Sequence, residues 1–371
     1  MKTTHKEEIY IKQDPFTDQI FDDSSIFFDI ETTGFSPAHT SCYLIGCAHR
    51  NGSSVTIDQF FAESEEEEEL IIQSFLELIA PFKTIISFNG IGFDIPYLKA
   101  KCDQYSLNEH FRTFQYIDIF KLISKMKFLF KLENYKQKTI ENFLGINRKD
   151  QFTGGDLINV YHDYVKRPDS KSCALLLLHN YEDVLGMTDL IPVLSYREFF
   201  QGKYAITETE FCDYTDYKDV KKREYIITMK MDCIVPKPVS CQIQGFYLTI
   251  SKDTAKLRVP VYCGELHFFY PNYKDYYYLP AEDIAIHKSV ASFVDKDFRQ
   301  KAKASNCYTR KEGEFLPQLS EIMKPAFRLE SKDAISYFEI SQDFSSSDIM
   351  LRRYVDHILL ALFPAENRKN L

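Results

Sequence analysis

The strongest constraint on the fold is residues 26–34, an apolar run that leads directly into two acidic residues. Side chains alternate between the two faces of a β-strand, so Asp29 and Glu31 would point the same way and Ile30 would point into the packing on the other face. Two carboxylates held side by side repel each other unless a cation lies between them. The segment alone leaves two interpretations open: an edge strand with two solvated acids, or part of a cation-binding site.

Length and composition limit the broad class of the protein. At 371 residues the chain is long enough for two domains. No apolar run approaches the ~20 residues of a membrane span, and the polar first residues are unlike a signal peptide. We therefore expect a cytoplasmic protein without membrane contact. Nine scattered cysteines with no Cys-x-x-Cys pair predict reduced thiols rather than a disulfide framework or a zinc ribbon.

Charge is unevenly distributed along the chain. The net charge of −9 has the wrong sign for a protein that only coats a polyanion, but it suits an enzyme that carries divalent cations. Residues 112–149 are the exception, with nine basic and three acidic residues. This basic stretch, which also contains aromatic residues, either forms solvated helix faces or contacts the phosphates and bases of a nucleic-acid strand.

The order of the predicted elements indicates a mixed α/β domain followed by a β-rich one. Strands are predicted over residues 26–31, 42–48, 54–61, 84–88 and 116–119. The first three form an antiparallel meander, because Asn51-Gly52 is a strong hairpin signal. The acidic run over residues 65–69 is predicted to begin a helix, where the helix dipole favours acids, rather than to bind metal. The predicted divisions are an arm over 1–23, the mixed α/β domain over 24–201 and a β-rich α+β domain of unknown role over 202–371, including a helix over 286–304.

Further acidic residues follow the ends of later elements. Asp94 comes after the fourth predicted strand, and Asp183 lies on a late helix with His179 one turn before it. Together with Asp29 and Glu31, the carboxylates of Asp94 and Asp183 could bind two hard cations such as Mg²⁺ or Mn²⁺, about 3.5–4 Å apart. Such a pair of ions suits phosphodiester hydrolysis, and a histidine that titrates near neutral pH can take a proton from the attacking water.

Three motifs, in this order, resemble those of the DEDD 3′–5′ exonucleases of the RNase-H-like superfamily. Asp-Ile-Glu-Thr-Thr-Gly at residues 29–34 resembles the first motif, and Asn-Gly-Ile-Gly-Phe-Asp at residues 89–94 resembles the second. His-Asn-Tyr-Glu-Asp at residues 179–183 resembles the third, in the version with histidine four residues before aspartate. The YprB-type predicted exonucleases are the most similar subgroup. The resemblance covers residues 24–197.

The resemblance implies an RNase-H-like mixed sheet of five strands with flanking helices, and two-metal hydrolysis at single-stranded DNA or RNA 3′ ends. By the same resemblance, the metal ligands would be Asp29, Glu31, Asp94 and Asp183. His179 would be the general base, and Thr32 would contact the terminal nucleotide. Asn89 would either hold the turn after its strand or touch the substrate.

Several alternatives stay open. The chain could be a non-catalytic nucleic-acid or protein binding module on the same fold, or a structure-specific endonuclease. Tyr181 also lies near Asp183, but the motif position four residues before the aspartate belongs to His179, so Tyr181 is expected to pack or hydrogen-bond nearby. Asp118 is interpreted as a solvated or helix-capping acid, and Asp156 as an N-cap.

Overall fold

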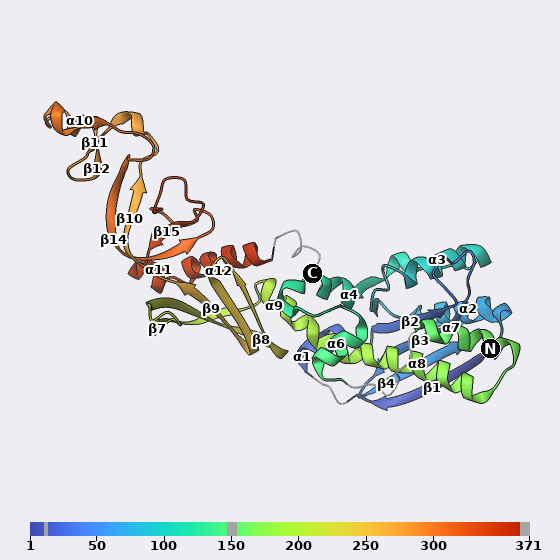
Figure 1. The fold of residues 1–371 in the computed structure, drawn as a ribbon. Coiled ribbons are helices and arrows are strands. Elements are labelled where there is room, and N and C mark those ends of the chain that lie inside the picture. The colour runs from blue at the N-terminus through green and yellow to red at the C-terminus, as the bar shows by residue number, and fades with distance from the viewer. Residues whose placement is uncertain (11–13, 147–153, 364–371) are drawn as a thin grey trace. The chain divides into compact units, whose positions relative to one another are not determined.

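The computed structural model describes residues 1–10, 14–146 and 154–363 (Figure 1). It divides into two compact units, which are treated separately below. The first contains Met1–Arg197 and Val235–Lys237, and the second contains Glu198–Ile234 and Pro238–Leu371. The division follows Arg197, four residues before the predicted boundary after residue 201. Arg148 and Lys149, two members of the basic stretch, lie outside the described residues.

A mixed sheet of six strands, in the order β1-β4-β3-β2-β5-β6, forms the centre of the first unit. The strands are β1 (Lys2–Ile9), β2 (Ser25–Thr32), β3 (Cys42–Asn51), β4 (Ser54–Phe61), β5 (Thr84–Ser87) and β6 (Gln115–Asp118). Strands β2, β3 and β4 pair antiparallel, while β5 pairs parallel with both β2 and β6. The predicted meander followed by α/β crossovers is confirmed.

The edge strand β1 corrects the prediction of an N-terminal arm. Lys2–Ile9 pairs antiparallel with β4 along its whole length, from Lys2 opposite Phe61 to Ile9 opposite Ser54, so the sheet has six strands instead of five. Nearly all of its side chains are exposed. A strand that is held by backbone pairing at a sheet edge needs no apolar face, so its sequence lacks the alternation by which strands are recognised.

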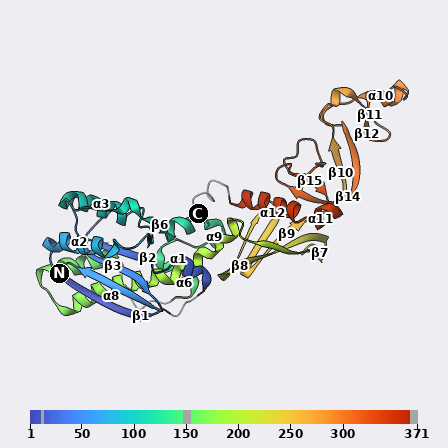
Figure 2. The same cartoon turned by 180° about the vertical axis from the view of Figure 1, so that it is seen from behind.

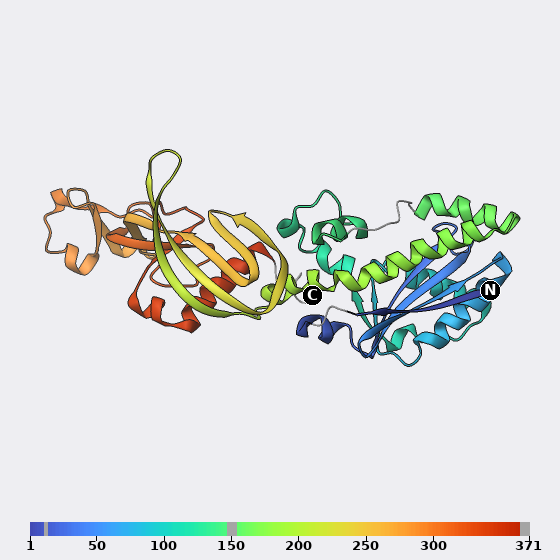
Figure 3. The same cartoon turned by 90° about the horizontal axis from the view of Figure 1, so that it is seen from below.

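Helices cover both faces of the sheet. The helices of this unit and of its junction with the second unit are α1 (Pro15–Ile20), α2 (Glu68–Ile79), α3 (Asp94–Tyr105), α4 (Ile119–Ser124), α5 (Lys127–Phe130), α6 (Gln137–Leu144), α7 (Gly154–Lys166), α8 (Ser170–Leu190) and α9 (Ser195–Phe200). On one face, Phe28 and Ile30 pack with residues of α2 and α3 such as Phe75 and Leu98. On the other, Tyr161 and Leu176 come from α7 and α8. Figure 3 shows α8, in yellow-green, lying along the sheet.

The start of α2 bears out the prediction that the acidic run begins a helix. Glu65–Glu67 form a 3₁₀ turn that leads into α2. Glu68 is buried and accepts hydrogen bonds from the Cys42 N–H (2.6 Å), the Lys101 ammonium (2.9 Å) and the Tyr105 hydroxyl (2.6 Å). Glu68 therefore ties α2 and α3 to the beginning of β3.

The N-cap prediction for Asp156 is wrong. Helix α7 begins at Gly154, which places Asp156 within its first turn. Two glycines are usually a turn signal, but here they belong to the helix itself.

The second unit is rich in β-structure, as predicted (Figure 2). It contains three small sheets, ordered β7-β8-β9, β10-β14-β15 and β12-β11-β13. Their strands are β7 (Ala205–Thr215), β8 (Lys221–Ile243), β9 (Phe246–Pro260), β10 (Tyr262–Phe269), β11 (Tyr276–Leu279), β12 (Ile284–His287), β13 (Gln300–Lys301), β14 (Tyr308–Gln318) and β15 (Ser336–Glu339). None of the helices among the described residues has the length and apolar character needed to cross a membrane.

The helix predicted over residues 286–304 is wrong. This segment holds the end of β12, the one-turn helix α10 (Lys288–Ala291), a 3₁₀ turn over Lys296–Phe298 and β13. The acids and lysines around Phe298 interrupt any continuous apolar stripe, so packing against the short strands prevails over helix propensity. The final helices of the unit are α11 (Gln342–Ser346) and α12 (Asp348–Leu362).

Candidate active site

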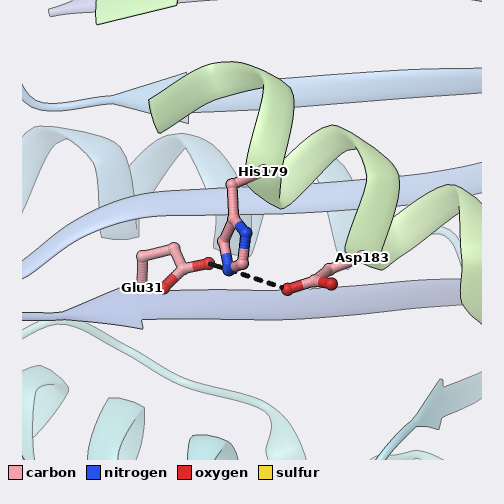
Figure 4. Close-up of side chains that lie close together, drawn as sticks. All are labelled: Glu31, His179 and Asp183. Atoms are coloured by element: carbon pink, nitrogen blue, oxygen red, sulfur yellow. Dashed lines mark ion pairs between the residues drawn. The ribbon is translucent and has the colours of Figure 1, made fainter. Parts of the chain in front are cut away.

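Strand β2 and helix α8 bring three of the predicted site residues together (Figure 4). His179 Nε2 lies 3.5 Å from Glu31 Oε1 and 3.2 Å from Asp183 Oδ2. His179 and Asp183 are four residues apart on α8 and so share one helical face. One ligand atom of each of the three residues lies within 4.8 Å of the other two, a spacing that one cation could bridge. His179 is buried and the two carboxylates are half-buried.

Asp94 and Asp29 lie close together at the neighbouring part of the sheet. Asp94 is the first residue of α3 and is buried, and its Oδ1 accepts a 3.4 Å hydrogen bond from the Ile30 N–H. Burial, followed by the nearby carboxylate of Asp29, raises the pKa of Asp94 well above its usual range. A site in which two carboxylates disfavour each other's charge is the environment that a divalent cation relieves.

Asp118 fixes the turn that delivers Asp94. Its carboxylate accepts hydrogen bonds from the Asn89 N–H (3.0 Å), the Ile91 N–H (3.2 Å) and the Lys121 N–H (2.9 Å). The last of these makes Asp118 the N-cap of α4, which confirms the helix-capping interpretation.

The two predicted substrate residues both form hydrogen bonds within turns that follow strands. Asn89 has φ of 68° and donates its N–H to Asp118, so it holds the turn after β5, one of the two roles considered for it. The Thr32 hydroxyl donates to the Gly34 carbonyl at 2.8 Å, within the turn that follows β2. Contact of either residue with a substrate stays a prediction.

A pocket of about 760 Å³ opens beside Asp29. Asn89 also lines it, and the remaining walls come from residues 88, 120, 127 and 131–137. Three lysines of the basic stretch line this pocket: Lys127, Lys131 and Lys136. The Lys127 ammonium lies 5.2 Å from the centre of the Tyr135 ring, so cationic and aromatic groups meet in one wall. The basic stretch thus contributes to a concave surface next to the acids, rather than only to solvated helix faces.

This arrangement agrees with a family comparison. Residues 26–195 match the model of the RNase_H superfamily. These residues form an RNase H-like domain. The matched range begins within β2 and ends after α8, so it includes all five proposed catalytic residues.

Solved structures of exonuclease I are also similar to the chain. A crystal structure of E. coli exonuclease I in complex with a dT13 oligonucleotide aligns with a TM-score of 0.28 at 10% identity, over 56% of this chain and 54% of that chain. A product-bound structure of exonuclease I aligns with a TM-score of 0.29 at 10% identity, over 56% and 58%. The alignments thus span little more than half of those chains. No curated protein matches the sequence significantly.

Within the RNase H-like domain, sequence reasoning missed Asn180. This residue is fully buried; its amide nitrogen donates to Asp29 Oδ2 at 3.5 Å, and its amide oxygen accepts from Gln59 Nε2 at 3.0 Å. Gln59 also donates to the Leu177 carbonyl at 2.8 Å, and its own Oε1 accepts from the Thr4 hydroxyl at 3.0 Å. Asn180 therefore connects Asp29 to a buried polar chain. The one available signal was its position directly after His179.

Gly46 is the second missed residue. It lies directly opposite Asp29 in the β2–β3 ladder. A Cβ on Gly46 would lie under 3.0 Å from Asn180 Oδ1 and 2.8 Å from Val184 Cγ2, closer than real Cβ atoms approach such neighbours. A glycine is needed here because α8 passes directly over this point of β3. Close helix-to-strand packing of this kind is a known reason for glycine within a strand.

Tyr181 points away from the proposed catalytic residues. Its hydroxyl donates to Glu8 on β1 at 2.5 Å, and the Lys6 ammonium lies 4.4 Å from the centre of its ring. Tyr181 thus forms a hydrogen bond, as expected, but with Glu8 of the edge strand, while His179 is the basic group beside Asp183.

Proposed function

We propose that this chain is a two-metal-dependent 3′–5′ exonuclease that releases nucleotides from the 3′ ends of single-stranded DNA or RNA. The observation that carries the proposal is the meeting of Glu31, His179 and Asp183 in an RNase H-like domain, with Asp29 and Asp94 at the adjacent strand end. A cytoplasmic location is part of the proposal, and it is supported by the nine cysteines, which are scattered along the chain without a Cys-x-x-Cys pair.

The donor set fits Mg²⁺ or Mn²⁺. The four proposed ligands, Asp29, Glu31, Asp94 and Asp183, all offer carboxylate oxygens, which hard divalent cations prefer. Burial and the nearby carboxylate of Asp29 both raise the pKa of Asp94, and a divalent cation bound here would favour its ionised form. When bound, two such ions would lower the pKa of an attacking water and neutralise the leaving 3′ oxygen.

The protein side chains supply the remaining chemistry in this proposal. His179 would take the proton of the attacking water, because imidazole is the side chain most often used as a general base. The nearby carboxylates of Glu31 and Asp183 would then stabilise the imidazolium that forms. The proton would leave to solvent when the histidine returns to its neutral form.

The pocket beside Asp29 would hold the strand that leads to the reacting end. Its lysines, Lys127, Lys131 and Lys136, would contact backbone phosphates, and Tyr135 would offer a ring for base stacking. Asn89 lines the same pocket and Thr32 follows the two acids of β2, so both would contact the terminal nucleotide. These contacts do not depend on base identity, which suits an enzyme that shortens strands of any sequence.

The test uses single-stranded DNA and RNA oligonucleotides labelled at the 5′ end, incubated with Mn²⁺. We expect a ladder of products shortened from the 3′ end, and loss of product in Asp29→Asn and Asp183→Asn variants that keep the wild-type melting profile. Glu77→Gln, an exposed acid on α2, is the matched control and should retain activity.

Each of the other outcomes has a definite meaning. Absence of products, or retained activity in both acid variants, would contradict the proposal. Oligonucleotide binding without hydrolysis would favour the non-catalytic binding module. Cleavage of a circular single strand would favour an endonuclease, since a circle has no 3′ end.

A further inference from the structure

The second unit contains a small module at one end of the β10–β14 ladder, seen in orange in Figures 1 and 2. Strands β10 and β14 pair from Tyr262 opposite Phe315 to Phe269 opposite Tyr308, and the sheet β12-β11-β13 follows beyond that end. The module has a core of its own, in which tyrosine rings pack around Ala285, Ala302 and Cys307. We define residues 288–303 of this module as the tip segment.

The tip segment exposes three apolar side chains within nine residues. Phe293 is 91% exposed, Phe298 is 64% exposed and Val290 is 57% exposed. Phe293 and Val290 lie one helical turn apart, since the Phe293 N–H donates to the Val290 carbonyl at 3.1 Å. Large apolar residues usually lie inside a protein, and a group of them on the surface marks an interaction site more often than scattered single residues do.

The charge of the tip segment is opposite to that of the whole chain. It contains five basic and two acidic residues, a local charge of +3 in a chain of −9. Lys296, Lys301 and Lys303 are exposed, and none of them forms an ion pair with another described residue. Exposed aromatic rings beside cations that lack protein partners are complementary to a polyanion whose subunits carry flat rings.

The other two basic residues have partners within the protein: the Lys288 ammonium pairs with Asp275 at 2.6 Å, and Arg299 has a structural role. The Arg299 guanidinium lies 4.9 Å from the centre of the Tyr277 ring and donates to the Ala291 carbonyl. It thereby holds the tip segment against β11. Because Arg299 fixes the backbone, the exposed phenylalanines are presented by an anchored segment, which lowers the entropy lost when a ligand binds.

We propose that the tip segment is a second contact site for single-stranded nucleic acid, separate from the pocket beside Asp29. Phe293 and Phe298 stack on bases, while Lys296, Lys301 and Lys303 contact phosphates. The choice of a nucleic acid over an anionic membrane surface rests on the proposed function. A second contact of this kind would hold a strand while its 3′ end is processed.

The experiment measures binding of a fluorescein-labelled 30-nucleotide dT strand to the full chain by anisotropy in EDTA, so that neither metal nor cleavage is needed. Phe293→Ala/Phe298→Ala should weaken binding by about tenfold or more, because each stacked base contributes substantially. Lys296→Ala/Lys301→Ala/Lys303→Ala should reduce the slope of log K against log salt by about 2, at ~0.7 per phosphate contact on a single strand. All the substituted side chains are exposed, and melting profiles verify that the variants fold.

The matched control is Tyr217→Ala/Lys218→Ala, which removes a 91% exposed aromatic ring and the lysine beside it at the β7–β8 turn of the same unit. Unchanged affinity and salt slope in the tip variants, or an equal loss in the control, would overturn the proposal. So would binding to phosphatidylserine vesicles that is lost in Phe293→Ala/Phe298→Ala while dT binding persists. Because the assay is free of metal, failure of the exonuclease test leaves this result standing, and the reverse also holds.

Discussion

Replacing Gly46 with alanine should disturb the candidate active site through α8. The added Cβ would lie 2.8 Å from Val184 Cγ2 and under 3.0 Å from Asn180 Oδ1. Both neighbours are buried, and Asn180 is held by Gln59, so neither can rotate into solvent. The hydrogen bond from Asn180 to Asp29 is already 3.5 Å long, so a small retreat of the amide would break it.

The expected cost can be worked out from this geometry. Overpacking in a well-filled interior destabilises by about 1–3 kcal/mol. For a cooperative unit of this size, each kcal/mol lowers the melting temperature by about 2–4 °C, so Gly46→Ala should lose about 2–12 °C. Mn²⁺ affinity, followed by isothermal titration calorimetry, should fall as well, because Asp29 loses its amide partner.

Two further variants make this prediction specific. Gly313→Ala on β14 is the control, since a Cβ there meets no atom closer than 3.5 Å. In an Asn180→Ala background the cost of Gly46→Ala should shrink, because the closest obstacle is gone; a double-mutant cycle measures this coupling. A Gly46→Ala protein with wild-type stability and Mn²⁺ affinity, or strictly additive effects in the cycle, would refute the reasoning.

Three other predictions concern charged side chains elsewhere in the chain. Lys101→Met removes one partner of the buried ion pair with Glu68, whose side chains are 4% and 2% exposed. Urea unfolding should show a free energy of unfolding that is lower by about 3–5 kcal/mol, and adding Glu68→Gln should recover part of this loss. Asp94→Asn should raise the melting temperature in EDTA at neutral pH. The pKa of Asp94 is raised in the folded state, so its carboxyl group favours folding only while it is protonated. The difference in melting temperature between the variant and the wild type should therefore narrow as the pH falls. The hydrogen bond to Asp58 raises the pKa of His5. The stability that this contact contributes is therefore complete below the ordinary pKa of histidine and is lost as the pH rises through the raised pKa. NMR titration should show a raised pKa of His5 that returns to normal in Asp58→Asn.

The strands and helices with strong apolar periodicity were predictable from the sequence, whereas those held by other forces were not. Strands β2 to β4 carry buried residues and a hairpin signal, and the sequence predicted all three. Strand β1 is polar on both faces and is held by its pairing with β4, so no periodicity reveals it. The helix predicted over residues 286–304 was wrong for the opposite reason. The segment has real helical propensity, but packing onto short strands decides its structure.

For the candidate site, the sequence predicted which groups carry chemistry but not which groups hold them. Acids at strand ends and a histidine one turn before an aspartate stand out because their residue types imply a reaction. Asn180 and Gly46 carry no such implication. Their roles depend on α8 crossing β3 at one particular point, which is a property of three-dimensional packing and not of local sequence.

The buried polar groups of this site are a poor choice for stability alone. A domain of this fold could place apolar residues where Asp94, Asn180 and Gln59 lie, all of them almost fully buried. A carboxylate whose pKa is raised by burial and by a neighbouring acid opposes folding at neutral pH, so a cation that binds there must stabilise the folded state. Mn²⁺ should therefore raise the melting temperature of the wild-type chain. The increase should be much smaller in Asp94→Asn, whose uncharged amide neither needs nor attracts the ion.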